Sequence, residues 1–370
     1  MTARTTIPMA DGPAPHQLRE VAKKVDARLE SVLHQQLDHW EQVDPRLCEA
    51  VAELQRMTTS GGKRLRAAFC YWAWRGVLSM RGAADGVDEL DDDLVIDVGA
   101  AFEFLQVFAL IHDDIMDNSA TRRGATTVHV ANGDRLTANN WQGEARRFGE
   151  GVAILVGDLG HVYADQLTGP INQNARRIWD ELRIELNLGQ YLDMRAAAAG
   201  EVDHATAQRV ATFKTALYTI VRPLQLGASL TGAVSPELLE QLDHFGRPLG
   251  RAFQLRDDAL GLVGDEKWLG KPVGDDLREG KPTEIVSFGL EHADAAQKQV
   301  LAEIGRRDLN GEEVARIVDV LNETGALRRN EESIERLLGE TNNALSALPF
   351  DGTTTDALAA MANYVAVRDR

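Results

Sequence analysis

The sequence has little cysteine, little positive charge and no long apolar run, and each shortage excludes a class of protein. Two cysteines in 370 residues, Cys48 and Cys70, cannot build a disulfide framework and lack the spacing of metal ligands, so we expect a cytoplasmic protein. A formal net charge of −17 argues against a general binder of nucleic acids or anionic membranes. No apolar run of 18 residues occurs, and the first residues lack a signal peptide's apolar core. We therefore expect neither secretion nor stable membrane insertion.

Strand patterns are missing as well. No segment alternates apolar and polar residues as a strand does, and the nucleotide-binding patterns GxGxxG and GxxxxGKS/T do not occur. After residue 16 the chain instead repeats apolar residues every three or four positions, as in Val21, Val25 and Leu29. Residues 1–16 are polar with three prolines and are expected to be disordered. The sequence predicts an all-α protein with a single large helical domain over residues 17–370.

The most unusual stretch is residues 103–117, EFLQVFALIHDDIMD, in which an apolar run ends in three carboxylates. In a helix, Asp113, Asp114 and Asp117 lie within about 100° of one face. Like charges beside an apolar interior raise one another's pKa unless a cation neutralises them, and carboxylate oxygens are suitable ligands for Mg²⁺. The alternative is an acidic helix end in solvent. It fits poorly because the preceding residues are apolar nearly all round the helix.

Two basic clusters flank this acidic run. The first, GGKRLR, places Lys63, Arg64 and Arg66 in the first turn of an expected helix. The dipole repels cations there, whereas free backbone N–H groups bind anions. The second is the pair Arg122 and Arg123 on a polar loop, and paired arginines can bind phosphate bidentately. Both clusters predict phosphate sites, with a solvated basic turn as the alternative for the first.

A second acidic cluster lies much later in the chain. Asp257 and Asp258 follow Gln254 by one turn in an apolar helical stretch, and the glycine-containing loop after them carries Lys271 and Lys281. A solvated run of charges is the alternative for this loop.

Polar residues and glycines also interrupt the apolar helical patterns between the two acidic clusters. Lys214 and Thr215 lie in the otherwise apolar stretch FKTALYT, where a buried lysine needs an anionic partner. Gly157, Gly189 and Gly227 each lower helix propensity by about 1 kcal/mol relative to alanine. Close helix packing or room for a ligand would explain these glycines.

Together the clusters indicate chemistry on diphosphates. Two aspartate clusters on separate buried helices could face each other across a cavity and hold several Mg²⁺ ions. The metal ions and Arg122, Lys214 and Lys271 would then stabilise the charge on a departing pyrophosphate. The second anion site, formed by Lys63, Arg66 and Arg123, predicts a second phosphorylated substrate.

In their order along the chain, these motifs resemble those of the trans-isoprenyl diphosphate synthases, in the polyprenyl synthetase family. The matching pieces run from Gly61 to about Thr283 and are GGKRLR, LIHDDIMDNSATRRG, GD, GQYLD, KTALYT, FQLRDD and GKPVGDDLREGK. The resemblance implies a helical bundle around a central cavity and a homodimer. It also implies Mg²⁺-dependent, head-to-tail condensation of isopentenyl diphosphate with allylic diphosphates of C5 to C15.

The resemblance also assigns roles to the residues that match the family's motifs. The metal ligands would be Asp113, Asp117 and Asp257, with about three Mg²⁺ ions per site. The catalytic set would be Asp113, Asp114, Asp117, Arg122, Lys214, Gln254, Asp257, Asp258 and Lys271. The substrate-binding residues would be Lys63, Arg66, Gln106, Arg123, Thr215 and Lys281, of which Lys63, Arg66, Gln106 and Arg123 would hold isopentenyl diphosphate.

Two positions bear on specificity. The family often has a third aspartate where this chain has Gly261, and Asp275 is close enough in sequence to support the remaining ion. Phe108, five residues before Asp113, and the neighbouring Ala109 would close the cavity floor, because a large aromatic there goes with short products in the resembling family. We therefore expect C20 geranylgeranyl diphosphate as the product, with C15 farnesyl diphosphate as the alternative.

Three other protein classes share parts of this pattern. A class I terpene cyclase also uses DDxxD, but it binds one diphosphate and would not need both basic clusters. A squalene-type head-to-head synthase fits less well, because we expect a basic site for isopentenyl diphosphate and do not expect a membrane anchor. A non-catalytic partner subunit should have lost its aspartates, whereas this chain keeps five of the six.

Overall fold

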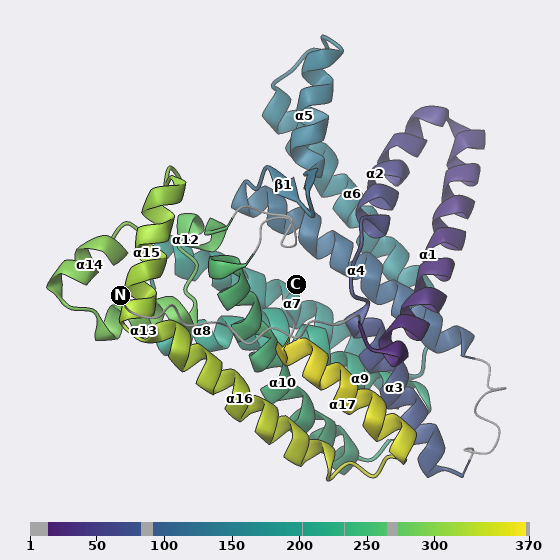
Figure 1. Cartoon of the computed structure of the whole chain (residues 1–370). Helices are drawn as coiled ribbons and strands as arrows, with labels where there is room; N and C mark the ends of the chain where they lie inside the picture. The colour runs from purple at the N-terminus through teal and green to yellow at the C-terminus, as the bar shows by residue number, and fades with distance from the viewer. Residues whose placement is uncertain (1–13, 83–91, 202, 233, 265–272, 368–370) are drawn as a thin grey trace. The chain divides into compact units, whose positions relative to one another are not determined.

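A computed structural model describes residues 14–82, 92–201, 203–232, 234–264 and 273–367. The chain forms two compact units (Figure 1). The N-terminal unit comprises His16–Gln173 and Gly227–Gly232, and the C-terminal unit comprises the described residues of Asn174–Leu226 and Ala233–Arg370. The expected disordered tail falls almost wholly outside the described residues, and helix α1 begins at His16. The single domain expected over residues 17–370 stays a prediction.

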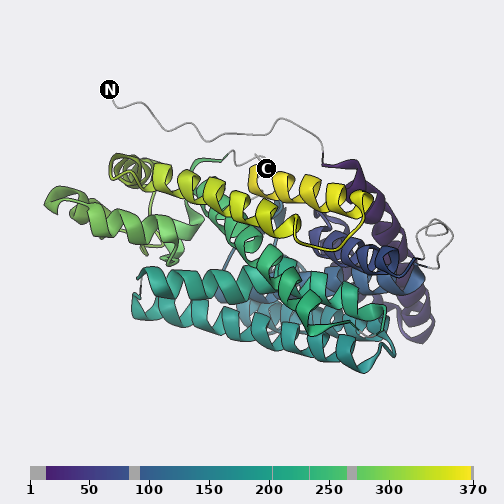
Figure 2. The same ribbon diagram turned by 90° about the horizontal axis from the view of Figure 1, so that it is seen from below.

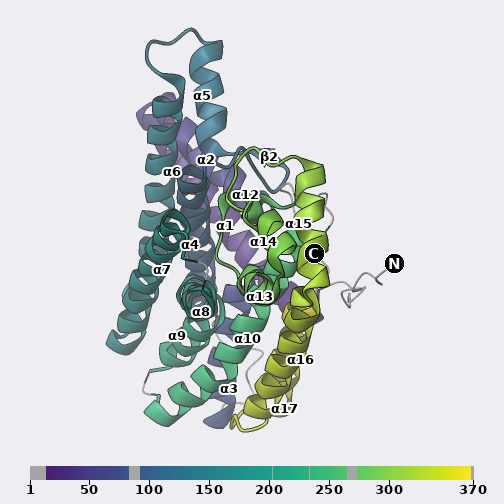
Figure 3. The same ribbon diagram turned by 90° about the vertical axis from the view of Figure 1, so that its left-hand side faces the viewer.

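The N-terminal unit is helical apart from one small hairpin, as the sequence predicts. Its elements are α1 (His16–Val43), η1 (Pro45–Leu47), α2 (Cys48–Thr59), α3 (Leu65–Met80), α4 (Asp93–Asp117), β1 (Thr121–Arg122), β2 (Ala125–Thr126), α5 (Val128–Ala138) and α6 (Ala145–Thr168). Helices α5 and α6 lie side by side (Figure 3). Within the described residues, β1 and β2 form the only sheet, a two-stranded antiparallel pair.

The C-terminal unit is helical throughout its described part. Its elements are α7 (Gln173–Ala199), α8 (His204–Val210), the π-helix η3 (Ala211–Val221), α9 (Arg222–Leu230), α10 (Pro236–Val263), α12 (Asp275–Glu279), α13 (Glu284–His292), α14 (Ala295–Leu301), α15 (Gly311–Glu323), α16 (Ala326–Leu345) and α17 (Gly352–Val367). The last residues of α9 belong to the N-terminal unit. The all-α class expected from the sequence is confirmed.

Helix α4 is the core of the N-terminal unit. Its most apolar window has a mean hydropathy of 2.0, enough by length and composition alone to cross a membrane. Asp97 and Glu103 interrupt α4, which passes this composition test although it contains no continuous apolar run of 18 residues. However, 67% of that window is buried inside the structure, and α4 packs against α1, α2, α3 and α6. A buried core helix passes the same composition test, so this finding is weak evidence for a membrane span.

Small residues bring α6 close to α4. A Cβ atom on Gly160 would lie 3.1 Å from the carbonyl oxygen of Phe104, and one on Gly157 would collide with the His112 ring. Close packing therefore explains Gly157, one of the three glycines that interrupt the apolar patterns. The contact fixes the α4 segment that precedes the acidic run.

Helix α10 is the central element of the C-terminal unit. Ser235 caps it by accepting a hydrogen bond from the Leu238 N–H, and Pro236 occupies its first turn. It packs against η3, α16 and α17, and the last two helices run side by side (Figure 2). These contacts bury the segment that carries Asp257 and Asp258.

Candidate active site

The acidic run lies at the C-terminal end of α4, as the sequence predicts. The helix ends at Asp117 because Asn118 adopts a left-handed conformation (φ 55°, ψ 40°), a common helix stop. The Asp114 residue is 1% exposed, whereas Asp113 and Asp117 are half-buried. Asp114 Oδ2 has no hydrogen-bond partner among the described residues.

Arg122 binds two of these carboxylates. Its Nε donates to Asp114 Oδ1 at 2.7 Å, and its Nη2 donates to Asp113 Oδ2 at 3.1 Å. Burial raises the pKa of Asp114 to about 6, an increase that the nearby Arg122 charge limits. Burial works against the Arg122 charge, but the carboxylates of Asp114 and Asp113 outweigh it and raise its pKa. Arg122 therefore neutralises part of the like charge that the sequence shows at this helix end.

A tight turn places Arg123 against the glycine-rich segment before α3. Arg123 and Gly124 both have positive φ (52° and 73°) in the turn joining β1 to β2, as a two-residue type I′ hairpin requires. Arg123 Nη1 donates to the carbonyl oxygen of Gly61 and to Ser60 Oγ. Burial and the nearby charges of Arg64, Arg122 and Arg66 lower the Arg123 pKa. The two basic clusters thus meet, and like charges in close contact favour an anion.

Arg64 departs from the expectation for the first basic cluster. Helix α3 begins at Leu65, so only Arg66 lies in its first turn, and Arg64 has φ 51° just before it. The Arg64 side chain turns inward, where it donates to Glu103 Oε2 at 2.7 Å and to Asp26 Oδ1 at 2.8 Å. Arg64 is therefore occupied by two carboxylates, and Lys63 and Arg66 remain the residues of this cluster that are predicted to bind an anion.

Glu103 is a residue that the sequence analysis missed. It is 3% exposed, and its Oε1 has no hydrogen-bond partner among the described residues. Gln106, one turn later on α4, is half-buried, and its Oε1 also has no hydrogen-bond partner in this part of the chain. The sequence could have indicated Glu103 only if Arg64 had been expected to be buried, because a buried arginine needs a carboxylate to neutralise its charge.

Phe108 lies between two imidazole rings. Its ring centroid is 4.6 Å from that of His112 and 5.1 Å from that of His161 on α6. Phe108 is 9% exposed and Ala109 is half-buried. Contacts from two helices therefore hold this ring in place, one turn before the acidic run.

The second acidic cluster is built around a hydrogen-bonded chain across two elements of the C-terminal unit. Thr215 on η3 donates to Gln254 Oε1 on α10, and Gln254 Nε2 donates to Asp258 Oδ1 at 2.6 Å. Asp258 is 8% exposed, whereas Asp257 is exposed. Burial, with the neighbouring carboxylates of Asp276 and Asp257, raises the pKa of Asp258 well above its ordinary value. Asp257 is therefore the more accessible of the pair to a metal ion.

Lys214 has the anionic partner that its apolar surroundings require. Its Nζ donates to Asp193 Oδ2 at 2.7 Å, and Asp193 is the last residue of the GQYLD motif. A Cβ atom on Gly189 would lie 2.7 Å from the backbone nitrogen of Lys214. This glycine therefore lets α7 approach η3 closely enough to form the ion pair.

The residue beside Gly261 is Asp276, not Asp275. A Cβ atom on Gly261 would lie 2.9 Å from Asp276 Oδ2, whereas Asp275 accepts a hydrogen bond from Arg278 at 3.0 Å. Asp276 is also close enough to Asp258 to raise its pKa. Sequence distance alone does not define which face of a helical turn meets α10, and the support of a metal ion by Asp275 stays a prediction.

Of the two remaining predicted lysines, the structure describes only Lys281. Lys281 Nζ is 2.7 Å from Glu279 Oε2 and 3.7 Å from Asp276 Oδ1. Lys271 lies outside the described residues. Its predicted role, like the roles of the other site residues, stays a prediction.

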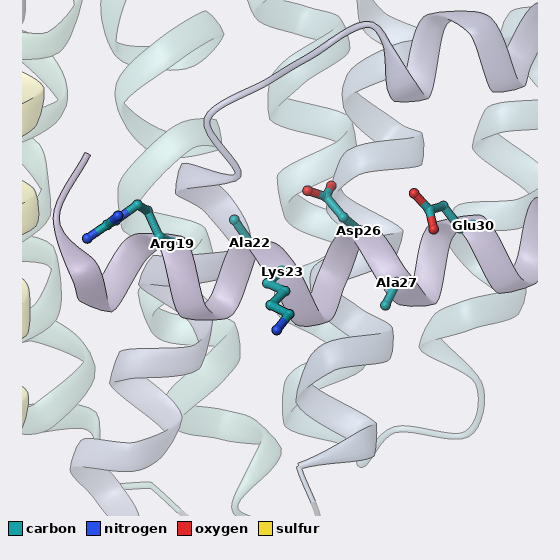
Figure 4. A pocket seen from close by; sticks show the side chains of 6 residues that line it. All are labelled: Arg19, Ala22, Lys23, Asp26, Ala27 and Glu30. Atoms are coloured by element: carbon teal, nitrogen blue, oxygen red, sulfur yellow. The ribbon is translucent and has the colours of Figure 1, made fainter. Parts of the chain in front are cut away.

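Two further features concern binding. No group of three or more histidine, cysteine, aspartate or glutamate residues that could hold a metal ion occurs within the described ranges. A hollow of ≈ 440 Å³ is lined by six residues of α1 (Figure 4), which are Arg19, Ala22, Lys23, Asp26, Ala27 and Glu30. None of these six belongs to the predicted site.

Comparisons with known proteins agree with the geometry. The family model for polyprenyl synthetase matches residues 48–323. Geranylgeranyl diphosphate synthase of Sulfolobus acidocaldarius is 34% identical over 289 residues, covering 75% of this chain and 77% of that protein. Geranylfarnesyl diphosphate synthase of Aeropyrum pernix is 29% identical over 319 residues, covering 84% of this chain and 91% of that protein.

A solved structure is similar over nearly the whole chain. It is a geranylgeranyl pyrophosphate synthase from Corynebacterium glutamicum, complexed with isoprenyl diphosphate and magnesium. It is 34% identical and has a TM-score of 0.88, with 95% of this chain and 99% of that chain covered. The chain therefore belongs to the polyprenyl synthetase family and is a prenyltransferase.

Proposed function

We propose that this protein condenses isopentenyl diphosphate head to tail with allylic diphosphates of C5 to C15, and releases C20 geranylgeranyl diphosphate. The observation that carries the proposal is the pair of polar clusters on buried helices. One contains Asp113, Asp114 and Arg122, and the other contains Gln254 and Asp258. Burying carboxylates in a protein core costs free energy unless opposite charges or hydrogen bonds compensate them. Their presence on two core helices therefore favours a site for a charged ligand.

The allylic diphosphate would bind through Mg²⁺. The donor set fits a hard divalent cation, because each cluster offers carboxylate oxygens and Asp114 Oδ2 is buried without a hydrogen-bond partner among the described residues. Asp113, Asp117 and Asp257 would hold about three ions. When bound, the ions would supply positive charge for the leaving pyrophosphate. Arg122 keeps Asp113 and Asp114 in one orientation, and Lys214 and Lys271 would contribute further positive charge.

Isopentenyl diphosphate would bind at the second anion site, which is formed by Lys63, Arg66 and Arg123. Arg123 lies against Gly61 and Ser60 and near Arg66, and Lys63 follows Gly61 by two residues in the sequence. Gln106, with its unpartnered Oε1, lies seven residues before Asp113 on α4. Since no carboxylate of the acidic run takes part, this substrate would bind without a metal ion.

The reaction then requires few groups from the protein. The allylic C–O bond breaks and its electron pair leaves with pyrophosphate, the double bond of isopentenyl diphosphate attacks the carbocation, and a proton is lost to the released pyrophosphate. The apolar side chains of α4 would keep water from the carbocation. Phe108, held between His112 and His161, would stop the growing chain at C20.

We also propose a homodimer. Exposed apolar side chains form rows on α6 (Ile154, Leu155, Val162) and on α7 (Ile184, Leu188, Tyr191), each at least 45% exposed. A second copy would cover such rows. Sedimentation should give about twice 40.6 kDa for the wild type and a smaller species for Leu188→Glu. A monomeric wild type would contradict this assembly. The cytoplasmic location expected from the two cysteines also stays a prediction.

The proposed activity is tested with purified protein, Mg²⁺, labelled isopentenyl diphosphate and a C5, C10 or C15 allylic primer. We expect label in a C20 product and a loss of about a hundredfold or more in turnover for Asp257→Asn. The matched control is Asp243→Asn on the same helix, because Asp243 pairs with Arg247 away from the site. Absence of labelled product with every primer would favour a non-catalytic partner subunit.

A further inference from the structure

A buried ion pair holds α10, the helix of the second acidic cluster, to α16 near the C-terminal end of the chain. Arg256 is 2% exposed, and its Nη1 and Nη2 donate to Glu331 Oε1 and Oε2 on α16, both at 2.9 Å. Its Nε donates to the carbonyl oxygen of Ala366 at 2.9 Å. Ala366 lies in the last turn of α17, where carbonyl groups lack intrahelical partners. One side chain thus pairs with α16 and caps α17.

A second bond lies directly beside the pair. Asn330, 5% exposed, donates to the carbonyl oxygen of Leu255 at 3.0 Å. Two adjacent residues of α16 therefore bind two adjacent residues of α10. Register errors between the two helices would break both contacts at once.

The position of Arg256 determines what this attachment does. Residues 254 and 258 lie within about 40° of each other on α10, whereas residue 256 is rotated by about 160–200° from both. One face of α10 is held by Thr215 through Gln254, and the opposite face is held by Glu331. The rotation of α10 about its axis is therefore fixed from both sides, and with it the direction of Asp257 and Asp258.

Stability alone does not explain such a pair. A buried Arg–carboxylate pair is often no more stable than apolar side chains of similar volume, because both charges lose their hydration. A bidentate pair does, however, impose a geometry that apolar contacts do not. The family match ends at residue 323, before α16 begins, so the family model assigns nothing to Glu331.

We propose that Glu331 is a positioning residue for the magnesium–diphosphate site, acting through Arg256 on Asp257 and Asp258. The last two helices then serve the reaction as well as completing the bundle. The inference rests on the proposed function, since it gives the second acidic cluster a metal-bound diphosphate to position.

The test compares Glu331→Gln with Glu332→Gln, its exposed neighbour on α16. Calorimetry measures the affinity of each protein for inorganic pyrophosphate in the presence of Mg²⁺, and steady-state kinetics give the KM of each substrate. We expect Glu331→Gln to weaken magnesium–pyrophosphate binding by about tenfold and to raise the KM of the allylic substrate. The KM of isopentenyl diphosphate and all values for Glu332→Gln should stay at the wild-type level. Equal binding by Glu331→Gln and the wild type would overturn the proposal.

A second variant covers the case in which Glu331→Gln does not fold. Arg256→Met combined with Glu331→Leu removes both charges and keeps apolar volume, a replacement that buried pairs tolerate. We expect this protein to fold, as circular dichroism would report, and to bind magnesium–pyrophosphate about tenfold more weakly. A folded double variant with wild-type binding would refute the positioning role. If the wild type binds magnesium–pyrophosphate but makes no product, the proposed function fails, while the binding comparison still decides the role of Glu331.

Discussion

Phe108 is the residue on which the proposed product length depends. Its ring packs against His112 and His161, so truncation to alanine leaves a space that neighbouring side chains cannot easily fill. We expect Phe108→Ala to shift the product from C20 to longer chains. The same change should lower the free energy of unfolding by about 3–5 kcal/mol. Chromatography of dephosphorylated products measures the shift.

A second cavity-forming substitution on α4 separates the effect of Phe108→Ala on product length from its effect on stability. Leu105, on the same helix, is fully buried, and Leu105→Ala should destabilise the protein by about 2–5 kcal/mol while the product stays C20. An unchanged profile for Phe108→Ala would remove the ring from the proposal. A longer product from both variants would attribute the shift to loosening of α4.

His129 predicts a pH dependence of stability. It is 6% exposed, and neither ring nitrogen has a hydrogen-bond partner among the described residues. Burial lowers its pKa, with Arg146 acting in the same direction and Glu150 against it. The His129 imidazole therefore binds a proton more readily in the unfolded chain than in the folded protein. The stabilisation is complete above the ordinary value of about 6.5 and is lost as pH falls through that value towards the folded pKa.

The experiment compares wild type with His129→Leu by denaturant unfolding between pH 7.5 and 5.5. We expect the wild-type free energy of unfolding to fall relative to that of the variant as the pH is lowered. His34, exposed on α1, gives the control His34→Leu, which removes an imidazole that is not buried. Parallel curves for His129→Leu and wild type would show that this imidazole titrates as it does in the unfolded chain.

Side-chain direction is what sequence spacing could not determine at the residue scale. Lys63, Arg64 and Arg66 occur together, yet Arg64 turns into the core because Glu103 and Asp26 lie there. Both partners are far from Arg64 in sequence. By contrast, the clustering of Asp113 and Asp114 followed from helical geometry alone, since residues adjacent on one helix share a neighbourhood whatever surrounds them.

At the scale of elements, the contact between α10 and α12 determines how the protein should respond to substitution of Gly261. Asp276 Oδ2 lies where a side chain at this position would project. A carboxylate added there would meet another carboxylate beside the buried Asp258. We expect Gly261→Asp to lower the free energy of unfolding by about 1–3 kcal/mol and to give no increase in turnover.

Alanine at the same position is the control. Gly261→Ala adds a Cβ atom against the end of a flexible side chain, and a helix interior favours alanine over glycine by about 0.5–1 kcal/mol. Its free energy of unfolding should therefore stay within about 1 kcal/mol of the wild type. Faster turnover in Gly261→Asp would indicate that a carboxylate at position 261 assists the reaction in spite of the neighbouring Asp276.

Helix type and helix ends were predictable to different degrees. Apolar spacing was sufficient for long helices such as α1 and α10, because their buried faces repeat over many turns. The start of α3 at Leu65 and the π-helix η3 were not predictable. The first depends on the left-handed Arg64, and the second carries Lys214 and Thr215 in a stretch whose composition also suits an α-helix. π-Helical segments occur frequently at functional sites.

At the scale of the whole molecule, the proposed mechanism requires carboxylates from two distant parts of the chain to act on one diphosphate. Asp113 belongs to the N-terminal unit and Asp257 to the C-terminal unit. Residues that act together on one ligand are non-additive, because the first substitution already removes much of what the second could remove. We expect the loss of magnesium–pyrophosphate affinity in Asp113→Asn with Asp257→Asn to be smaller than the sum of the single losses, with a coupling of about 0.5–3 kcal/mol.

The control cycle pairs Asp113→Asn with Asp243→Asn, which lies on the same helix as Asp257 but forms an ion pair with Arg247. Asp243 shares no ligand with Asp113 in the proposed site. The losses of affinity caused by the two substitutions should therefore add within about 0.5 kcal/mol. Additive losses in both cycles would mean that the two acidic clusters bind separate ligands. The head-to-tail condensation proposed here would then lack its common leaving-group site, and two independent anion sites would be the better description of the molecule.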